Sequence, residues 1–174
     1  MPDKLSPKKL KKQLKKHEKH KTRADFSQAD FSGLDLKGFS LARANLSECN
    51  LSGANLKAAN LDDANLRQTN FENATLRKAS LRKVMANWAS FRRCDLSEAV
   101  LKDADLRWAN FEAAELTNAD LRRADLRDAN LSGANLKNAN LNGANLRRAN
   151  LEQTELKKAN YDQHTEWPEG FKPA

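Results

Sequence analysis

The sequence is poor in the residues that perform most enzyme chemistry. Its 174 residues include three histidines, two cysteines and one tyrosine, and no histidine lies between residues 21 and 163. Ser/His and Cys/His pairs, which activate nucleophiles in many hydrolases, therefore cannot form within that long segment. A glycine-rich phosphate-binding loop is also missing from the sequence. We expect that the protein is not an enzyme and binds no cofactor.

The few residues that could bind a metal or act as acids are placed unfavourably. His17 and His20 are three residues apart in a lysine-rich segment, and two histidines alone do not complete a metal site. Asp62 and Asp63 are adjacent carboxylates, but both are expected to point outward at a corner of the fold described below. We predict no metal site and no catalytic residue.

Long apolar runs are absent as well, so no segment of the sequence is suited to span a membrane. The N-terminus is charged but lacks the apolar stretch of a signal peptide, and we expect a cytoplasmic protein. A mean hydropathy of −0.84 and 31% charged residues would suggest disorder in a chain without periodicity. The periodicity of this chain excludes that interpretation.

A five-residue repeat dominates the sequence. Central large residues recur every fifth position from Phe26 to Tyr161, which gives 28 repeats without an insertion. The centre is leucine in 21 repeats and phenylalanine in five, and the residue two places earlier is alanine in 21. Five matches neither the 3.6-residue period of a helix nor the two-residue period of a strand. Each repeat must therefore contain a bend that returns the next central residue to the same side.

The composition of the repeat predicts a coil with a narrow core. The small residue and the central residue are two apart, so both should point inward from a short extended segment. No charged residue occupies either position, and Cys49 and Cys94 replace alanine as reduced core residues. Glycines lie two places after a centre, where a sharp corner needs permissive backbone angles; they are Gly33, Gly38, Gly53, Gly133 and Gly143.

Residues 51–81 and 131–161 match at outward positions too, and the second segment begins 16 repeats after the first. Sixteen is divisible by four but not by three, which favours a square coil of four repeats. The Ala-(Asn/Asp)-Leu-x-x pattern of residues 24–163 resembles the pentapeptide-repeat family. The resemblance implies an all-β solenoid: a right-handed quadrilateral parallel β-helix, here of about seven coils, with a short N-terminal α-helix and a C-terminal plug.

The N-terminal segment, residues 1–23, carries a net charge of +8, whereas the repeats are nearly neutral. Residues 7–21 are expected to form a helix with an apolar stripe at Leu10 and Leu14. Such a helix could cap the open end of the β-helix, or its lysines could bind nucleic acid or an anionic membrane. The two roles are compatible, and the candidate polyanion-binding residues are Lys8, Lys9, Lys11, Lys12, Lys15, Lys16, Lys19 and Lys21.

The C-terminal tail, residues 164–174, leaves the repeat. Trp167 and Phe171 should fold back over the last coil as its plug, and the run resembles the endings of many cyanobacterial pentapeptide-repeat proteins. With both ends covered, we expect a monomer.

Residues four repeats apart should lie above one another, so the outer faces can be compared. One face carries two stacked tryptophans beside an arginine ladder, and both residue types are enriched at binding hot spots. The alternative is that the rings cover a core thinned at Ala86, where Val84 compensates for the lost leucine. The candidate partner-binding residues are Met85, Trp88, Trp108, Arg67, Arg107 and Arg127.

Three functions follow from these features. A non-enzymatic interaction scaffold that presents the tryptophan and arginine face to a protein partner is favoured. Binding of nucleic acid or an anionic membrane through the N-terminal lysines is the alternative. The family's gyrase-directed DNA mimics need a strongly negative surface, but the outward residues of the four faces have net charges of 0, −2, +2 and +1. DNA mimicry is therefore the least favoured.

Overall fold

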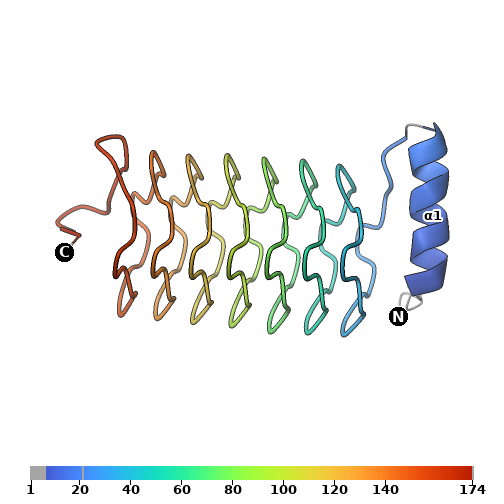
Figure 1. The fold of residues 1–174 in the computed structure, drawn as a ribbon, viewed down its shortest axis with the longest axis horizontal. Coiled ribbons are helices and arrows are strands. Elements are labelled where there is room, and N and C mark those ends of the chain that lie inside the picture. Colours follow the sequence, from blue (N-terminus) through green and yellow to red (C-terminus); the bar gives the residue numbers. More distant parts are fainter. Residues whose placement is uncertain (1–6, 21, 174) are drawn as a thin grey trace.

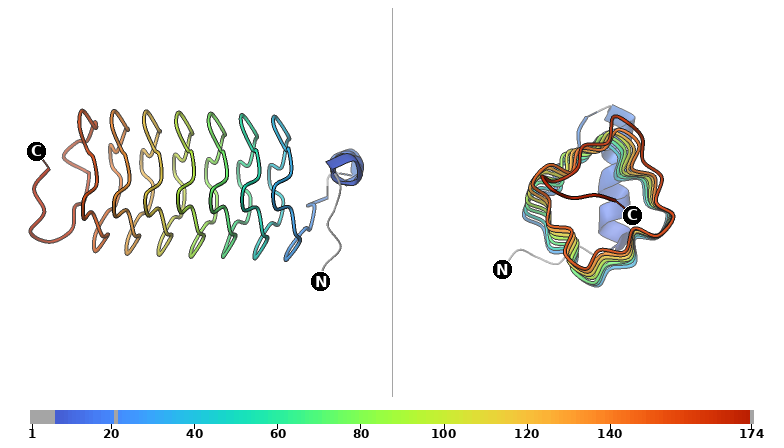
Figure 2. Two further views of the ribbon diagram at one scale, coloured as in Figure 1. Left: turned by 90° about the horizontal axis from the view of Figure 1, so that it is seen from below. Right: turned by 90° about the vertical axis from the view of Figure 1, so that its left-hand side faces the viewer.

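The computed structural model describes residues 7–20 and 22–173. They form one helix, α1 (Pro7–His20), followed by a rod of stacked coils, with the helix at one end and the C-terminus at the other (Figure 1). Viewed along the rod, each coil is four-sided (Figure 2).

Parallel β-bridges join residues that are four repeats apart, from Asp25↔Asn45 to Asn140↔Asn160. Four five-residue repeats therefore complete one coil, as the offset of sixteen repeats predicted. In the described part of the chain, the β-structure consists of isolated bridges, and none of them extends into a strand. The reason is geometric, because each side of the coil extends over only a few residues before the next corner.

Backbone hydrogen bonds repeat along the rod. The N–H of Leu106 donates to the carbonyl of Asp125 at 2.8 Å, and the N–H of Asp125 donates back to the carbonyl of Ala104 at 2.9 Å. Successive coils are thus joined on every side, which satisfies backbone groups that the buried interior could not leave unpaired.

Every corner from residue 28 to residue 158 lies in the left-handed backbone region. The five predicted glycines have φ between 63° and 68°, and 22 other residues occupy equivalent corners with φ between 53° and 62°. Glycine was correctly predicted at the corner, but the fold holds most corners in this conformation without it. A non-glycine residue there is less stable by about 1 kcal/mol or more, so the hydrogen bonds of the coil offset a repeated strain.

The core consists of the inward residues of each repeat, nearly all of which are inaccessible to solvent. Phe91 stacks between Phe71 and Phe111, with ring centroids 5.0 and 4.8 Å away. The thiols of Cys49 and Cys94 are free and buried, and each donates to a backbone carbonyl. Val84 and Ala86 are both buried as well, so the exchange of large and small residues keeps this repeat in the coil.

The asparagine or aspartate that precedes most central residues has a structural role. Asn45 is an example: its amide nitrogen donates to Asp25 at 2.9 Å, and its Oδ1 accepts from the amide of Asn65 at 2.8 Å. The same oxygen accepts from the backbone N–H of Ser47 and so stabilises the start of the corner. Side chains of this column therefore join coils outside the backbone ladder.

Helix α1 lies across the N-terminal end of the rod (Figures 1 and 2). Leu10 is fully buried in the core cluster, and Leu14 packs against it. Leu34 and Phe39, which replace small residues near this end, also pack against the core. The helix thus covers apolar surface that an open coil would expose.

The C-terminal end differs from the prediction in one respect. Tyr161, expected as the last inward centre, is 43% exposed. The bridge Asn145↔Glu166 joins residues one position further apart than the bridges before it, and the hydroxyl of Thr165 donates to the carbonyl of Leu141 at 3.0 Å. One extra residue has therefore entered the last turn, and Thr165 takes the small inward position. Trp167 and Phe171 stack on each other and pack against the core.

Candidate partner-binding face

Trp88 and Trp108 form the most prominent feature of the outer surface. Their ring centroids are 4.7 Å apart and their planes differ by 5°. The two residues are 55% and 41% exposed, and Tyr161 is the only other exposed large apolar residue in the described part of the chain. The predicted stack therefore exists, and its ring edges face solvent.

Both tryptophans occupy corners, each with a φ of 57°. A bulky side chain in the left-handed region is uncommon. Ala58 and Ala113 occupy equivalent corners, so the backbone does not require a large residue at this position. Ala86 is fully buried with the rings in place.

Arg107 and Arg127, predicted to bind a partner, are already paired within the chain. Arg107 donates through Nε and Nη2 to both oxygens of Asp105, at 2.8 and 2.7 Å, and Arg127 binds Asp125 in the same way. The guanidinium of Arg107 also lies 5.4 Å from the Trp108 ring centroid. The guanidinium groups of Arg107 and Arg127 are therefore already bound by aspartates of the same chain. The reason is the column of residues before each centre, which supplies an aspartate two positions ahead of each arginine.

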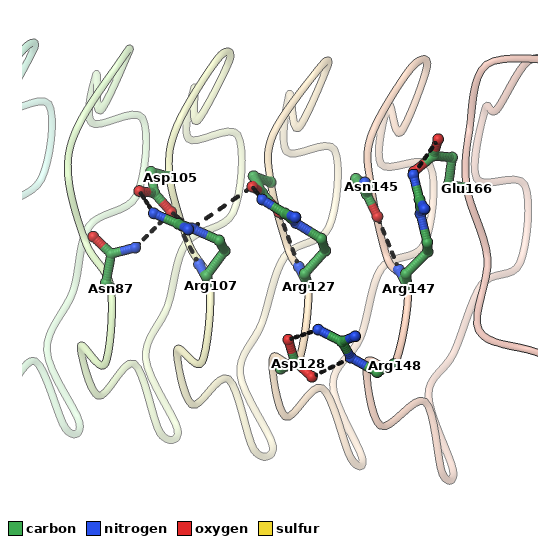
Figure 3. A network of polar contacts seen from close by, with 10 residues as sticks. Asn87, Asp105, Arg107, Arg127, Asp128, Asn145, Arg147, Arg148 and Glu166 are labelled. Atoms are coloured by element: carbon green, nitrogen blue, oxygen red, sulfur yellow. Dashed lines mark hydrogen bonds and ion pairs between the residues drawn. The ribbon is translucent and has the colours of Figure 1, made fainter.

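The paired groups are arranged in a row along the rod (Figure 3). Asn87 is almost fully buried; its amide donates to Asp105 at 2.6 Å, and its Oδ1 accepts from Nε of Arg67 at 3.4 Å. Burial of the Asp105 carboxyl opposes ionisation, but hydrogen bonds from Arg107 and Asn87 outweigh it and lower its pKa. Asn87, Asp105 and Asp125 are thus parts of the face that sequence reasoning missed. Their positions in the repeat, directly before or after a centre, were the available signal.

The other predicted residues of this face are also present on it. Met85 is half-buried and forms bridges to Asn65 and Asp105, so it belongs to the side of the coil rather than to the exposed corner. Arg67 is exposed one coil before Asn87, and no ion pair involves it among the described residues. Arg147 continues the column and binds Glu166 through two hydrogen bonds, at 2.7 and 2.8 Å.

The lysines of α1 lie away from this face. Lys8, Lys9, Lys12 and Lys15 are exposed on the helix. The side chains of Lys11, Lys16 and Lys19, and the whole of Lys21, lie outside the described residues.

Residues 7–20 and 22–173 include no group of three or more His, Cys, Asp or Glu residues that could hold a metal ion. No helix among them is long and apolar enough to cross a membrane.

Burial raises the pKa of the Cys49 thiol to about 12 and that of the Cys94 thiol well above its usual range, which makes both poor nucleophiles. A shallow groove of about 330 Å³ is lined by Lys102, Arg122, Arg123, Asn142, Gly143, Asp162 and His164. Its arginines bind Asp120 and Asp103, which largely neutralises it.

A comparison with solved structures finds other pentapeptide repeat proteins. A pentapeptide repeat protein from the thylakoid lumen of Arabidopsis thaliana is 27% identical, with 68% of each chain covered and a TM-score of 0.52. The cyanobacterial pentapeptide repeat protein Rfr23 from Cyanothece is 26% identical over 91% of this chain and 99% of that one, with a TM-score of 0.24. QnrB1, a plasmid-mediated fluoroquinolone resistance protein, is 17% identical over 80% and 83% of the two chains, with a TM-score of 0.46.

A comparison with curated proteins finds no match. The family model of the pentapeptide repeat region matches residues 19–87 and 86–161, which together cover most of the sequence. This match, with the coil of four repeats, confirms the right-handed quadrilateral β-helix that the resemblance to this family implied. The chain belongs to the pentapeptide repeat family.

Proposed function

We propose that this protein is a non-enzymatic scaffold of the cytoplasm that binds a protein partner through the face around Trp88 and Trp108. In this proposal the protein is a monomer. Its rod has seven coils, because 28 repeats at four repeats to a coil give that number. Members of the family are generally structural or interaction proteins rather than enzymes. The observation that carries the proposal is the exposed, stacked tryptophan pair.

The pair offers large apolar area at a low entropic cost. Tryptophan is among the commonest hot-spot residues of protein interfaces, and its side chain has only two rotatable bonds. Here each ring is also held by its neighbour at 4.7 Å, on a backbone fixed by hydrogen bonds to the coils on both sides. Little conformational freedom remains to be lost when a partner binds.

The surrounding charges define the rim of this surface. Arg107 and Arg127 are paired with aspartates of the same chain, so the rim is polar, ordered and close to neutral. A partner therefore gains mainly from contact with the ring edges and the indole N–H groups. A strongly charged partner gains little, because the ion pairs already satisfy the guanidinium forks.

The backbone conformation supports a role for the rings beyond folding. Corners with the same backbone conformation on other sides of the coil carry alanine, at Ala58 and Ala113, so the corner does not require a large aromatic side chain.

The test is a comparison of the wild type with the variant Trp88→Ala/Trp108→Ala in affinity capture from the native host. The variant should fold normally, as judged by its unfolding transition, and should fail to capture the partner. A matched variant, Asn118→Ala/Lys158→Ala, changes exposed corners on the opposite side of the coil and should capture normally. Capture of the same proteins by all three would show that this face is not the binding surface.

A direct measurement would complete the test. Once captured, the partner should bind the purified wild type and quench or shift its tryptophan fluorescence. The double variant retains only Trp167, at the C-terminal end, and should show neither binding nor a spectral change. Unchanged affinity would contradict the proposal even if capture had differed.

A further inference from the structure

The positive charge of this protein is confined to one end of the rod. Residues 1–23 contain ten of the 31 basic residues and two of the 23 acidic ones, a net charge of +8. The total is also +8, so residues 24–174 are neutral overall. Within the rod, ion pairs hold acidic and basic side chains together along its length. The molecule therefore has a cationic end and a shaft without net charge.

The packing of α1 directs Lys8, Lys12 and Lys15 outward. Leu10 is fully buried in the core and Leu14 packs against it, so the apolar side of the helix faces the first coil. With about 100° between successive residues, Lys8, Lys12 and Lys15 fall on the opposite side of the helix. All three are exposed. Glu18 is the only acidic residue in the sequence of α1.

The helix lies across the end of the rod (Figures 1 and 2). Because Leu10 faces the core, the side of the helix that carries Lys8, Lys12 and Lys15 faces away from the first coil. Its 14 residues extend over roughly 21 Å at about 1.5 Å per residue. A flat anionic surface could contact this whole length at once without touching the neutral shaft.

We propose that the lysine side of α1 binds the anionic surface of a phospholipid membrane, so that the rod stands end-on. Lysine ammonium groups attract lipid phosphate and carboxylate groups, and each contributes about fivefold in affinity near such a surface. The helix inserts no apolar side chain, because its leucines are occupied by the core. Binding is therefore electrostatic, reversible and sensitive to salt.

A membrane fits these observations better than nucleic acid. A DNA duplex that continued from the α1 lysines along the rod would meet its four sides. The outward residues of these sides have net charges of 0, −2, +2 and +1, so none of them offers a continuous positive track. The exposed lysines provide point charges, whereas bases are read chiefly by the planar groups of arginine, asparagine and glutamine. A planar lipid surface can bind by contacting α1 alone, at the N-terminal end of the rod.

End-on binding also keeps the partner-binding face free. Trp88 lies three coils beyond Gln28, which is about 14 Å along the rod at the usual strand spacing of about 4.8 Å. The membrane proposal is independent of the proposed protein partner, since it uses different residues at a different place. Together they would make the rod a membrane-attached post that displays its tryptophans above the surface.

The test is flotation of the full chain with vesicles of phosphatidylcholine and phosphatidylserine mixed 7:3, and with vesicles of phosphatidylcholine alone. Wild type should float with the anionic vesicles at low salt, about 50 mM NaCl, and remain unbound at about 500 mM NaCl. The variant Lys8→Gln/Lys12→Gln/Lys15→Gln should bind about 100-fold more weakly, because three fivefold contributions are removed. Its far-ultraviolet spectrum and unfolding midpoint should match the wild type, since Leu10 is unchanged.

The matched control removes the same charge from exposed positions of the shaft, as Lys57→Gln/Lys83→Gln/Lys158→Gln, and should bind like the wild type. Equal binding by the α1 variant, or equal loss in the control, would overturn the proposal. So would tighter binding to a short DNA duplex than to the vesicles.

The orientation has its own readout. Brominated lipids quench tryptophans at the bilayer, and all three tryptophans of this protein lie beyond the first coil. Bound protein should show unquenched fluorescence. Quenching would mean that the rod lies on its side, which would refute the end-on arrangement.

Discussion

Leu106→Ala combined with Ala104→Val would transfer the arrangement of Val84 and Ala86 to the next coil. Leu106 and Ala104 are both buried, so each change acts on the packed core. Leu106→Ala alone should lower the free energy of unfolding by about 3–4 kcal/mol through lost contacts and a cavity. Ala104→Val alone should lower it by about 1–3 kcal/mol through overpacking.

The combined variant should lose far less free energy of unfolding than the two single variants lose together. The leucine loses three carbons and the alanine gains two, so the net change is one carbon, worth about 0.8 kcal/mol of burial. A total loss of about 1–2 kcal/mol is expected, with a favourable coupling of about 2 kcal/mol or more between the sites. Val84 and Ala86 show that the backbone accommodates this exchange, since Met85 keeps its bridges to both neighbouring coils.

Equilibrium unfolding in urea, followed by far-ultraviolet circular dichroism, measures all four proteins of the cycle. The same exchange at Ala134 and Leu136, on another side of the rod, serves as a control for local context. Additive losses at both sites would refute volume compensation. Some other interaction would then have to keep the repeat centred on Ala86 in the coil.

Three further predictions concern the core, the thiols and the charge of the faces. Leu106→Asp should abolish folding because it buries an unpaired charge, whereas Lys137→Ala should change stability by less than about 0.5 kcal/mol; urea unfolding distinguishes these outcomes. Because burial raises the pKa of Cys49 to about 12, the thiol's contribution to stability is intact below pH 9 and falls as the pH rises toward 12. Both thiols should resist iodoacetamide at mildly alkaline pH until urea unfolds the chain, and rapid labelling of folded protein would contradict their burial. Purified protein should not inhibit gyrase supercoiling at micromolar concentration, because no face carries dense negative charge; potent inhibition would show that local charge arrangement outweighs the net.

The sequence was informative wherever one periodic property decides the structure. Leu131, Leu136 and their equivalents must all face inward, and the five-residue spacing of such residues allows only a coil with regular corners. Even the number of repeats per coil could be predicted, because matches at an offset of sixteen repeats favour four repeats per coil over three. The stack of Trp88 on Trp108 followed from the same spacing of four repeats.

Side-chain partners within the surface could not be predicted in the same way. The sequence showed Arg107 and Arg127 as exposed cations, but a guanidinium on a long side chain can reach several acids. Which acid it binds depends on rotamers that the spacing does not determine. Asp105 and Asp125 precede their arginines by two residues and share their side of the coil, so they are the nearest acceptors.

The end of the rod was mispredicted for a different reason. Tyr161 follows the spacing, so the pattern assigned it to the core, yet the chain adds one residue before Thr165. An irregular last turn costs little, because no later coil has to match it. Periodic reasoning is weakest where the period is about to stop.

The coil of four repeats makes the length of this rod and the direction of its faces separately adjustable. Deleting one repeat between Trp88 and Trp108 would keep every leucine inward, but it would rotate all later residues by a quarter turn and separate the two rings. Deleting four repeats would instead shorten the rod by about 5 Å and leave the remaining columns aligned. A rod of this kind can therefore lose or gain whole coils without scrambling its surface, whereas any smaller change redirects everything beyond it.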